Sequence, residues 1–228
     1  MRTLVSLALV GLSGCIVHIG SGDLVDVDLP VDAFDAMAAE QGLVVRHVEG
    51  ERAVTAHIDD NLRDLLVVEV VDGELRMGFG DLPILVDPSD DAWIEVVAPP
   101  PERFSASGGA SIDAVGAGEV VRLSASGGAG IEVVVTATTR AEVSASGGAD
   151  VTLGGTAPAV DVDASGGATV TSTIKAGSAS VSASGGAHVS VHATTSVTVS
   201  ASGGSTVEVA GDPEDRDVDT SGGSTVTF

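Results

Sequence analysis

The residues of this chain that could do chemistry are mainly serines, histidines and acids, and their spacing does not assemble a catalytic set. No serine lies in a G-x-S-x-G motif, and a nucleophilic serine needs a base and an orienting acid beside it. His188 and His192 would lie about 13 Å apart along a strand, which is too far to share one metal ion. We therefore expect no catalytic residue, no metal site and no cofactor.

A polysaccharide-cleaving enzyme is the catalytic alternative. Such β-helical enzymes need paired carboxylates, a basic residue and usually aromatic platforms for the sugar rings. From residue 102 onward the chain has no Trp or Tyr, and its basic residues are Arg103, Arg122, Arg140, Lys175 and Arg216. This class stays the weaker alternative.

Calcium is a second possibility, because the chain has 33 Asp and Glu residues and ten Lys and Arg residues. Ca²⁺ is bound by oxygen ligands, and β-rolls bind it through the repeat G-G-x-G-x-D-x-U-x. Only residues 127–132 approach that repeat, so we expect no calcium roll. A single loop site at 81–91 or 212–217 stays open, with solvated turns as the other interpretation.

The only cysteine, Cys15, ends the sequence Leu12-Ser13-Gly14-Cys15. The apolar run 4–12 before it follows one positive charge and is far too short to span a bilayer. This arrangement is typical of a bacterial lipoprotein signal, in which the cysteine is acylated and becomes the mature N-terminus. We therefore predict a signal peptide over 1–14 and a lipid at Cys15 that attaches the protein to a membrane of the cell envelope. Ile16, where an Asp would indicate inner-membrane retention, favours the outer membrane.

The charge balance excludes one class of partner. The formal net charge is -23, so the chain lacks the basic patch that binding to DNA or RNA requires. Aromatic residues make up only 2% of the chain. Small and β-branched residues must therefore fill the interior.

From residue 105 the chain repeats a Ser-Gly-Gly motif about every 19 residues. The residues four before and four after the first glycine of each copy are apolar, and polar and apolar residues alternate on both sides. This alternation is the pattern of strands with one buried face, and Gly-Gly between two such runs predicts a sharp turn that needs positive φ. The predicted turn glycines are Gly108, Gly127, Gly147, Gly166, Gly185, Gly203 and Gly222.

A repeat of this length cannot bury its own apolar face, but copies stacked about 4.8 Å apart bury each other's. The sequence therefore predicts an all-β fold, a single-stranded parallel β-helix (solenoid) of about seven regular turns of about 19 residues with a less regular β N-terminal part. We expect two or three short strands in each copy. The serine before each first glycine is expected to donate its hydroxyl to a neighbouring turn, with a binding surface along this column of serines as the second interpretation.

The domain boundaries follow from where the repeat begins. We expect a lipidated N-terminus and tether, or a first strand, over 15–31, and one continuous domain over 32–228 with an irregular first part (32–101) and regular repeats (102–228). Residues 60–64 suggest one helical turn with Asp60 as a possible cap. The strands predicted in the first part are 43–48, 53–58, 65–71, 74–79 and 92–97, with a hairpin turn at 71–74.

Outward positions three and five residues after each first glycine form one candidate binding surface. Thr-x-Thr arrays on β-helices resemble ice-binding faces, but only two of the seven copies have both threonines, Thr169/Thr171 and Thr225/Thr227. Strand propensity on a solvated face explains these threonines better. We expect a shallow polar face that takes a protein or glycan ligand.

The segments Phe34-Asp35-Ala36-Met37 and Val71-Asp72-Gly73-Glu74-Leu75, followed by the repeated Ser-x-Ser-Gly-Gly, resemble the bacterial head GIN domain family over about residues 32–228. Members are described as auto-transporter adhesin heads, and the resemblance implies a secreted or surface β-helical protein with no catalytic residues to transfer. We therefore expect a lipid-anchored envelope protein whose rigid, acidic β-helix is a structural or adhesive module. An envelope accessory that binds another envelope protein is the alternative.

Overall fold

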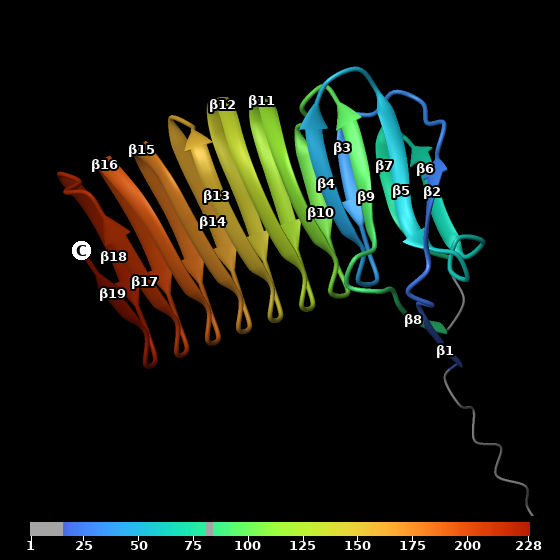
Figure 1. Ribbon diagram of the computed structural model, residues 1–228. Helices are drawn as coiled ribbons and strands as arrows, with labels where there is room; N and C mark the ends of the chain where they lie inside the picture. Colours follow the sequence, from blue (N-terminus) through green and yellow to red (C-terminus); the bar gives the residue numbers. More distant parts are fainter. Residues whose placement is uncertain (1–15, 81–83) are drawn as a thin grey trace, which may run out of the picture.

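The computed structural model describes residues 16–80 and 84–228, and within them it has nineteen strands and no helix. Cys15 and residues 81–83 of the predicted calcium loop lie outside the described residues. Most strands lie side by side along one axis, as the coils of a parallel β-solenoid of about seven turns (Figure 1). The predicted all-β solenoid is confirmed.

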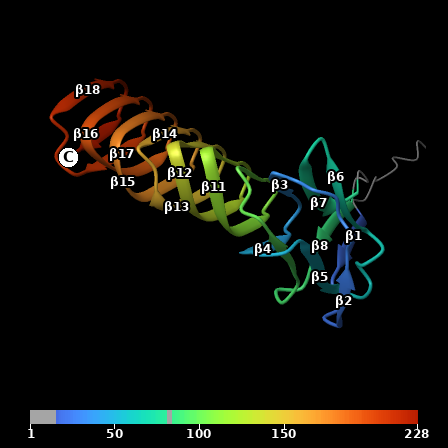
Figure 2. The ribbon, with the colours of Figure 1, turned by 90° about the horizontal axis from the view of Figure 1, so that it is seen from above.

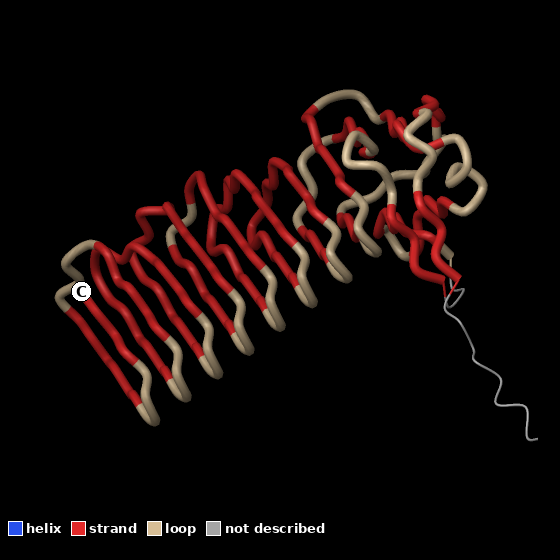
Figure 3. Tube along the Cα trace, turned by 60° about the horizontal axis from the view of Figure 1, so that its bottom comes forward, coloured by secondary structure: helices blue, strands red, loops and turns tan. Residues whose placement is uncertain are grey.

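Each coil has two arms joined by a Ser-Gly-Gly turn, and these turns line up along one edge of the solenoid (Figure 3). Seen from above, the coils enclose a narrow core (Figure 2). The strands of this part are β10 (Arg103–Ala106), β11 (Ser111–Ala125), β12 (Gly130–Ala145), β13 (Asp150–Thr156), β14 (Ala159–Ala164), β15 (Thr169–Ala183), β16 (His188–Ala201), β17 (Thr206–Ala210), β18 (Asp215–Thr220) and β19 (Thr225–Thr227).

The prediction of two or three short strands per copy was wrong for most of the repeat. Four strands, β11, β12, β15 and β16, continue through the bend opposite the turn and are 14 to 16 residues long. The chain is divided there between β13 and β14, where Pro158 stands. Proline has no backbone N–H to donate to the neighbouring coil, so it interrupts the ladder.

Apolar side chains one coil apart lie in register inside the solenoid. One column runs Ile112, Ile131, Val151, Val170, Val189, Val207 and Val226. The opposite column runs Phe104, Leu123, Val143, Val162, Val181, Val199 and Val218. Most members are 0–4% exposed, so each valine contributes roughly 1.5–3 kcal/mol of hydrophobic stabilisation.

The Ser-Gly-Gly turns are tied together through their backbones. The first glycine of each has φ between 60° and 72°, a region that L-residues other than glycine rarely adopt. From Gly148 onward, the N–H of the second glycine donates to the carbonyl of the preceding coil's first glycine at 2.6–2.7 Å. At the preceding serine the inter-coil bond comes from the backbone N–H, at 2.9–3.0 Å from an alanine carbonyl, and replaces the predicted hydroxyl bond.

The solenoid begins earlier than residue 102. Strand β3 (Ala36–Ala39) pairs in parallel with β10, and β4 (Val44–Glu49) pairs in parallel with β11. The turn between them, residues 40–42, stands where later coils have Ser-Gly-Gly, and Gln41 adopts a φ of 58°. The Gln41 side chain accepts a hydrogen bond from the Phe79 N–H at 2.6 Å, and this contact holds the turn without the usual glycine.

The remaining N-terminal strands cover the first coil, and we call them the cap. They are β2 (Leu24–Asp28), β5 (Ala53–Asp59), β6 (Leu66–Val71), β7 (Glu74–Phe79) and β9 (Trp93–Ala98). Strands β7 and β9 continue the parallel order on β3 and β4, whereas β6 pairs with β7 in antiparallel order, β5 with β9 and β2 with β5. The predicted hairpin is present, with Asp72 and Gly73 at φ of 52° and 80°. A small separate sheet pairs β1 (Ile16–Ile19) with β8 (Ile84–Asp87).

The segment predicted as a tether or a first strand holds two strands, β1 and β2. Residues 60–65 form hydrogen-bonded turns, in which the Asp59 carbonyl accepts from the N–H groups of Leu62 and Arg63. The Arg63 bond spans four residues, as in the single helical turn that was predicted, but the predicted cap needs correction. The Asp60 side chain does not cap a helix but accepts from the Ser21 hydroxyl at 2.6 Å.

Stability is expected to depend on pH through His47, which is 6% exposed on β4. Its Nε2 lies 3.1 Å from the Ala98 carbonyl, and burial lowers its pKa below the ordinary value of 6.5, against the raising effects of that carbonyl and of Glu49. Below pH 6.5 the unfolded chain therefore binds the proton first, so the free energy of unfolding falls as the solution is acidified. His47→Gln should flatten this slope in urea titrations between about pH 5 and 7. Parallel curves for the two proteins would contradict the assignment.

Candidate binding groove

One broad outer face of the solenoid is built from the arms that run into the turns, together with β3, β6 and β7. We call it the arginine face. Its outward residues lie five and three positions before each first glycine, and the strand register aligns them in two rows. The outer row is Glu74, Ala36, Arg103, Arg122, Glu142, Asp161 and Ser180. The inner row, nearer the turns, is Arg76, Ala38, Ser105, Ser124, Ser144, Asp163 and Ser182.

A groove of about 800 Å³ lies on this face over β10, β11, β12, β14 and β15. Long arginine and acidic side chains in the outer row stand beside small serines in the inner row, and this difference in length makes the hollow. A second hollow of about 740 Å³ continues it toward β6, and both are lined by Glu74 and Ser105. The apolar residues of these arms are buried in the core, and Phe104, Leu123, Val143 and Val162 also contribute to the floor of the groove between the polar residues.

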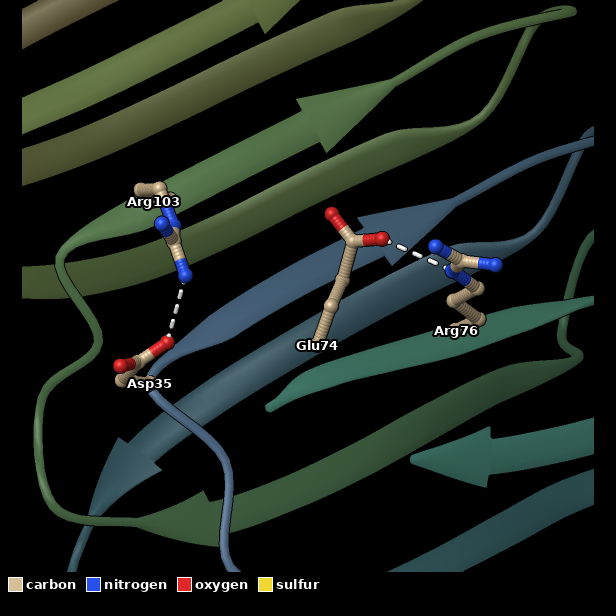
Figure 4. A network of polar contacts seen from close by, with 4 residues as sticks. All are labelled: Asp35, Glu74, Arg76 and Arg103. Atoms are coloured by element: carbon tan, nitrogen blue, oxygen red, sulfur yellow. Dashed lines mark hydrogen bonds and ion pairs between the residues drawn. The ribbon is translucent and has the colours of Figure 1, made fainter. Parts of the chain in front are cut away.

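Two ion pairs border the groove near β3 (Figure 4). Arg103 Nη2 donates to Asp35 Oδ1 at 2.7 Å, and Arg76 Nε donates to Glu74 Oε2 at 2.8 Å. The Glu74 hydrogen bond raises the pKa of Arg76 above its ordinary value, so this guanidinium is charged at any physiological pH. The strand between the two pairs, β3, has only alanines in these rows, Ala36, which is buried, and Ala38, which is half-buried.

Three further contacts link the arms of β11, β12 and β14. Arg122 Nε lies 2.8 Å from Glu142 Oε2, and Arg140 Nη1 lies 2.9 Å from Asp161 Oδ2. Arg140 Nε is also 3.9 Å from Glu142 Oε1. The three arginines of the groove are 45–51% exposed, so each pair contributes only about 0–1 kcal/mol to stability.

These arginines keep most of their hydrogen-bonding capacity for a ligand. A guanidinium has five N–H donors in a fixed fork, and Arg103, Arg122 and Arg140 each direct one nitrogen to a carboxylate within 3 Å. Together with Arg76 they make up four of the ten Lys and Arg residues in the chain. The groove itself is lined by three of these arginines, Arg103, Arg122 and Arg140, and by four acids, Glu74, Glu142, Asp161 and Asp163.

The candidate groups from the sequence lie elsewhere. The turn glycines line the narrow edge, and the Thr-x-Thr positions lie on the opposite broad face. His188 and His192 are on β16, where each pairs with a different residue of β15. In the loop at 212–217, Arg216 donates to Asp212 and to the Pro213 carbonyl. Within residues 16–80 and 84–228, no three His, Cys, Asp or Glu side chains are grouped to hold a metal ion.

The sequence contains a signal for the arginine face, although the predicted binding surface was placed at outward positions after each first glycine and does not include it. Arg103 and Arg122 both stand five residues before a first glycine, and serine follows two residues later in both copies. The contribution of Asp35, 68 residues from Arg103, has no local sequence signal.

Comparison with known proteins identifies the family. The model of the family described as "Putative auto-transporter adhesin, head GIN domain" matches residues 33–213. The chain belongs to this family. A search of curated proteins gave no match.

In the described part of the chain, no helix is long and apolar enough to cross a membrane.

Several solved structures share the fold. A protein of Bacteroides fragilis described as a putative adhesin superimposes with a TM-score of 0.79 at 19% identity, covering 92% of this chain and 98% of its own. A putative lipid binding protein from Parabacteroides distasonis gives a TM-score of 0.67 at 14% identity, covering 93% and 99%. A putative adhesin from Parabacteroides merdae gives 0.64 at 17% identity, covering 93% and 99%. The likeness extends over the cap as well as the repeats.

Proposed function

We propose that this protein is a non-enzymatic adhesive or structural module of the cell envelope, anchored by a lipid at Cys15 and using the arginine face as its contact surface. The observation that carries the proposal is the groove of about 800 Å³ with three arginines, held on a stack of hydrogen-bonded coils. The backbone hydrogen bonds between coils hold the strands that carry these side chains, so little backbone ordering entropy is lost on binding. The family description supports an adhesive role.

Lipid anchoring is tested by Cys15→Ala in the producing bacterium. The wild-type protein should sediment with membranes, whereas the variant should be recovered in the soluble fraction, because one signal segment of this length cannot hold the chain in a bilayer. Fractionation and immunoblotting measure how the protein divides between the two fractions. We expect most of the variant to move from the membrane fraction to the soluble fraction. If the variant stays with the membrane to the same extent as the wild type, a lipid at Cys15 does not anchor the protein.

Location and contact surface are tested on intact cells. Protease shaving followed by mass spectrometry should release peptides of the solenoid if the protein is exposed at the surface of the outer membrane. Photocrosslinking from Ser124, inside the groove, should capture an external ligand if the module is adhesive. Repeated capture of one envelope protein, with no release by protease, would instead support the accessory role and overturn surface adhesion.

A further inference from the structure

The outer row of the arginine face holds two pairs of like charge in register, Glu142 with Asp161 and Arg103 with Arg122. Arg140 contacts both acids of the first pair, at 3.9 Å from Glu142 Oε1 and 2.9 Å from Asp161 Oδ2. The two arginines are paired with separate acids, Asp35 and Glu142, and in the described part of the chain no ion pair joins one carboxylate to both of them. These two arginines are direct register partners on adjacent parallel strands.

Like charges directly opposite each other on a sheet destabilise it. The backbones of β10 and β11 are about 4.8 Å apart, so the two side chains rise side by side at the centre of the groove. The acid of each lies on its outer side, Asp35 beside Arg103 and Glu142 beside Arg122. One negatively charged group between the two guanidinium forks would do for the arginines what Arg140 does for Glu142 and Asp161.

The shape of that group follows from the donors. Two planar guanidinium groups side by side match an oxyanion with two or more oxygens, because each fork donates in pairs to a carboxylate or phosphate. Beside them, Ser105 and Ser124 offer hydroxyls, and Asp163 offers an acceptor farther along the groove. The lining combines these polar groups with apolar residues, Met37, Phe104, Leu123, Val143 and Val162, which suits a sugar ring with both hydroxyls and apolar C–H groups.

We propose that the Arg103–Arg122 pair binds the carboxylate of an acidic glycan, whose hydroxyls extend along the serines of the inner row. This proposal rests on the proposed function, since it names the ligand of the same contact surface. The overall charge of -23 repels an anion at long range, but at about 0.15 M salt this repulsion is screened beyond roughly 8 Å. Direct contacts with the two arginines then decide binding.

The test uses the purified full chain carrying Cys15→Ala, so that no lipid contributes, with calorimetry at about 0.15 M salt. The probes are oligogalacturonate, an oligomer of sialic acid and an alginate oligomer, and the matched control probe is the methyl ester of the oligogalacturonate. We expect at least one acidic oligomer to bind and the ester to bind at least about tenfold more weakly. Arg103→Gln and Arg122→Gln should each weaken binding about tenfold or more, the size expected for a lost charged hydrogen bond.

Arg63→Gln is the matched control variant, because Arg63 is also half-exposed and also paired with one carboxylate, that of Asp64. It should leave the affinity unchanged, and thermal unfolding should show that all three variants are folded. Equal binding of acid and ester, equal binding by the Arg103 and Arg122 variants, or no binding of any oligomer would overturn the proposal. Arginine-dependent binding to phosphatidylglycerol vesicles in place of the oligomers would overturn it in favour of a lipid headgroup. Because the assay is done in solution, its failure is distinct from a failure of membrane anchoring.

Discussion

Replacing Gly185 by alanine is expected to lower the free energy of unfolding by about 2–4 kcal/mol, since it combines backbone strain with a steric clash. Gly185 has a φ of 70°. A Cβ at this position would lie 2.9 Å from the Gly166 carbonyl oxygen and 3.1 Å from the Gly166 nitrogen. Both atoms belong to the backbone of the preceding coil, so the clash can be relieved only by separating two coils at their shared edge.

Gly186 supplies the matched control, one residue along the same turn. Its φ is not in the left-handed region, and a Cβ there would lie 3.5 Å from the Gly166 oxygen, an ordinary contact. Gly186→Ala should therefore change stability by less than about 1 kcal/mol. Urea unfolding of both variants, followed by circular dichroism, makes the comparison. If the two substitutions lower the free energy of unfolding equally, the positive φ and the close approach at Gly185 do not determine the turn.

Removing the Asp59 carboxylate is expected to have the second large effect, about 3 kcal/mol for Asp59→Ala. Asp59 is 0% exposed at the end of β5. Its Oδ1 accepts from the Gly22 N–H at 2.8 Å and from the Ser89 hydroxyl, and its Oδ2 accepts from the Ser89 N–H at 3.0 Å. One side chain thus joins the segment before β2 to the loop after β8, and alanine would leave three donors without their acceptor.

The same carboxylate predicts a pH dependence with a definite sign. Burial by itself would raise the pKa of Asp59, but the hydrogen bonds from Ser89 and Gly22 outweigh it and lower the pKa below its ordinary 3.8. The stabilisation is therefore present above pH 3.8 and is lost as the pH falls through the lower, folded-state pKa. Acid unfolding should show this loss in the wild type and not in Asp59→Ala.

Asp60 is the control for both measurements, because it is the next residue, is exposed, and makes one side-chain hydrogen bond, to Ser21. Asp60→Ala should cost less than about 1 kcal/mol. Limited proteolysis should cut the loop around Ser89 faster in Asp59→Ala than in Asp60→Ala. Equal cleavage and equal stability of the two variants would show that Asp59 does not hold these segments together.

Local and periodic features of the molecule could be predicted from the sequence. The spacing of Ser-Gly-Gly and the alternation around it predicted the solenoid, its inward valines and the glycines that have positive φ. These features are readable because a strand has a side-chain period of two and a coil has a nearly constant length, so each residue's role depends on close neighbours. The 71–74 hairpin was readable for the same reason.

The first coil and the cap could be predicted only in part. Strands β4, β5, β6, β7 and β9 were predicted close to their observed bounds. The coil made by β3 and β4 was not recognised, because Gln41 takes the place of a turn glycine and its unusual φ is held by a side-chain bond to Phe79, 38 residues away. A contact between residues so far apart produces no repeating pattern in the sequence.

By itself the sequence determined the solenoid, the acidity and the residues that can turn sharply, since period, charge and backbone freedom are properties of the chain. The tertiary structure decided the groove. Between β11 and β12 the register shifts by one residue after Gly118, and this bulge places Glu142, and not Ala141, beside Arg122. Asp35 reaches Arg103 only because β3 stacks on β10. Which charges become neighbours depends on how coils of unequal length are aligned, and that alignment is set by the packing of the core and the backbone hydrogen bonds between coils.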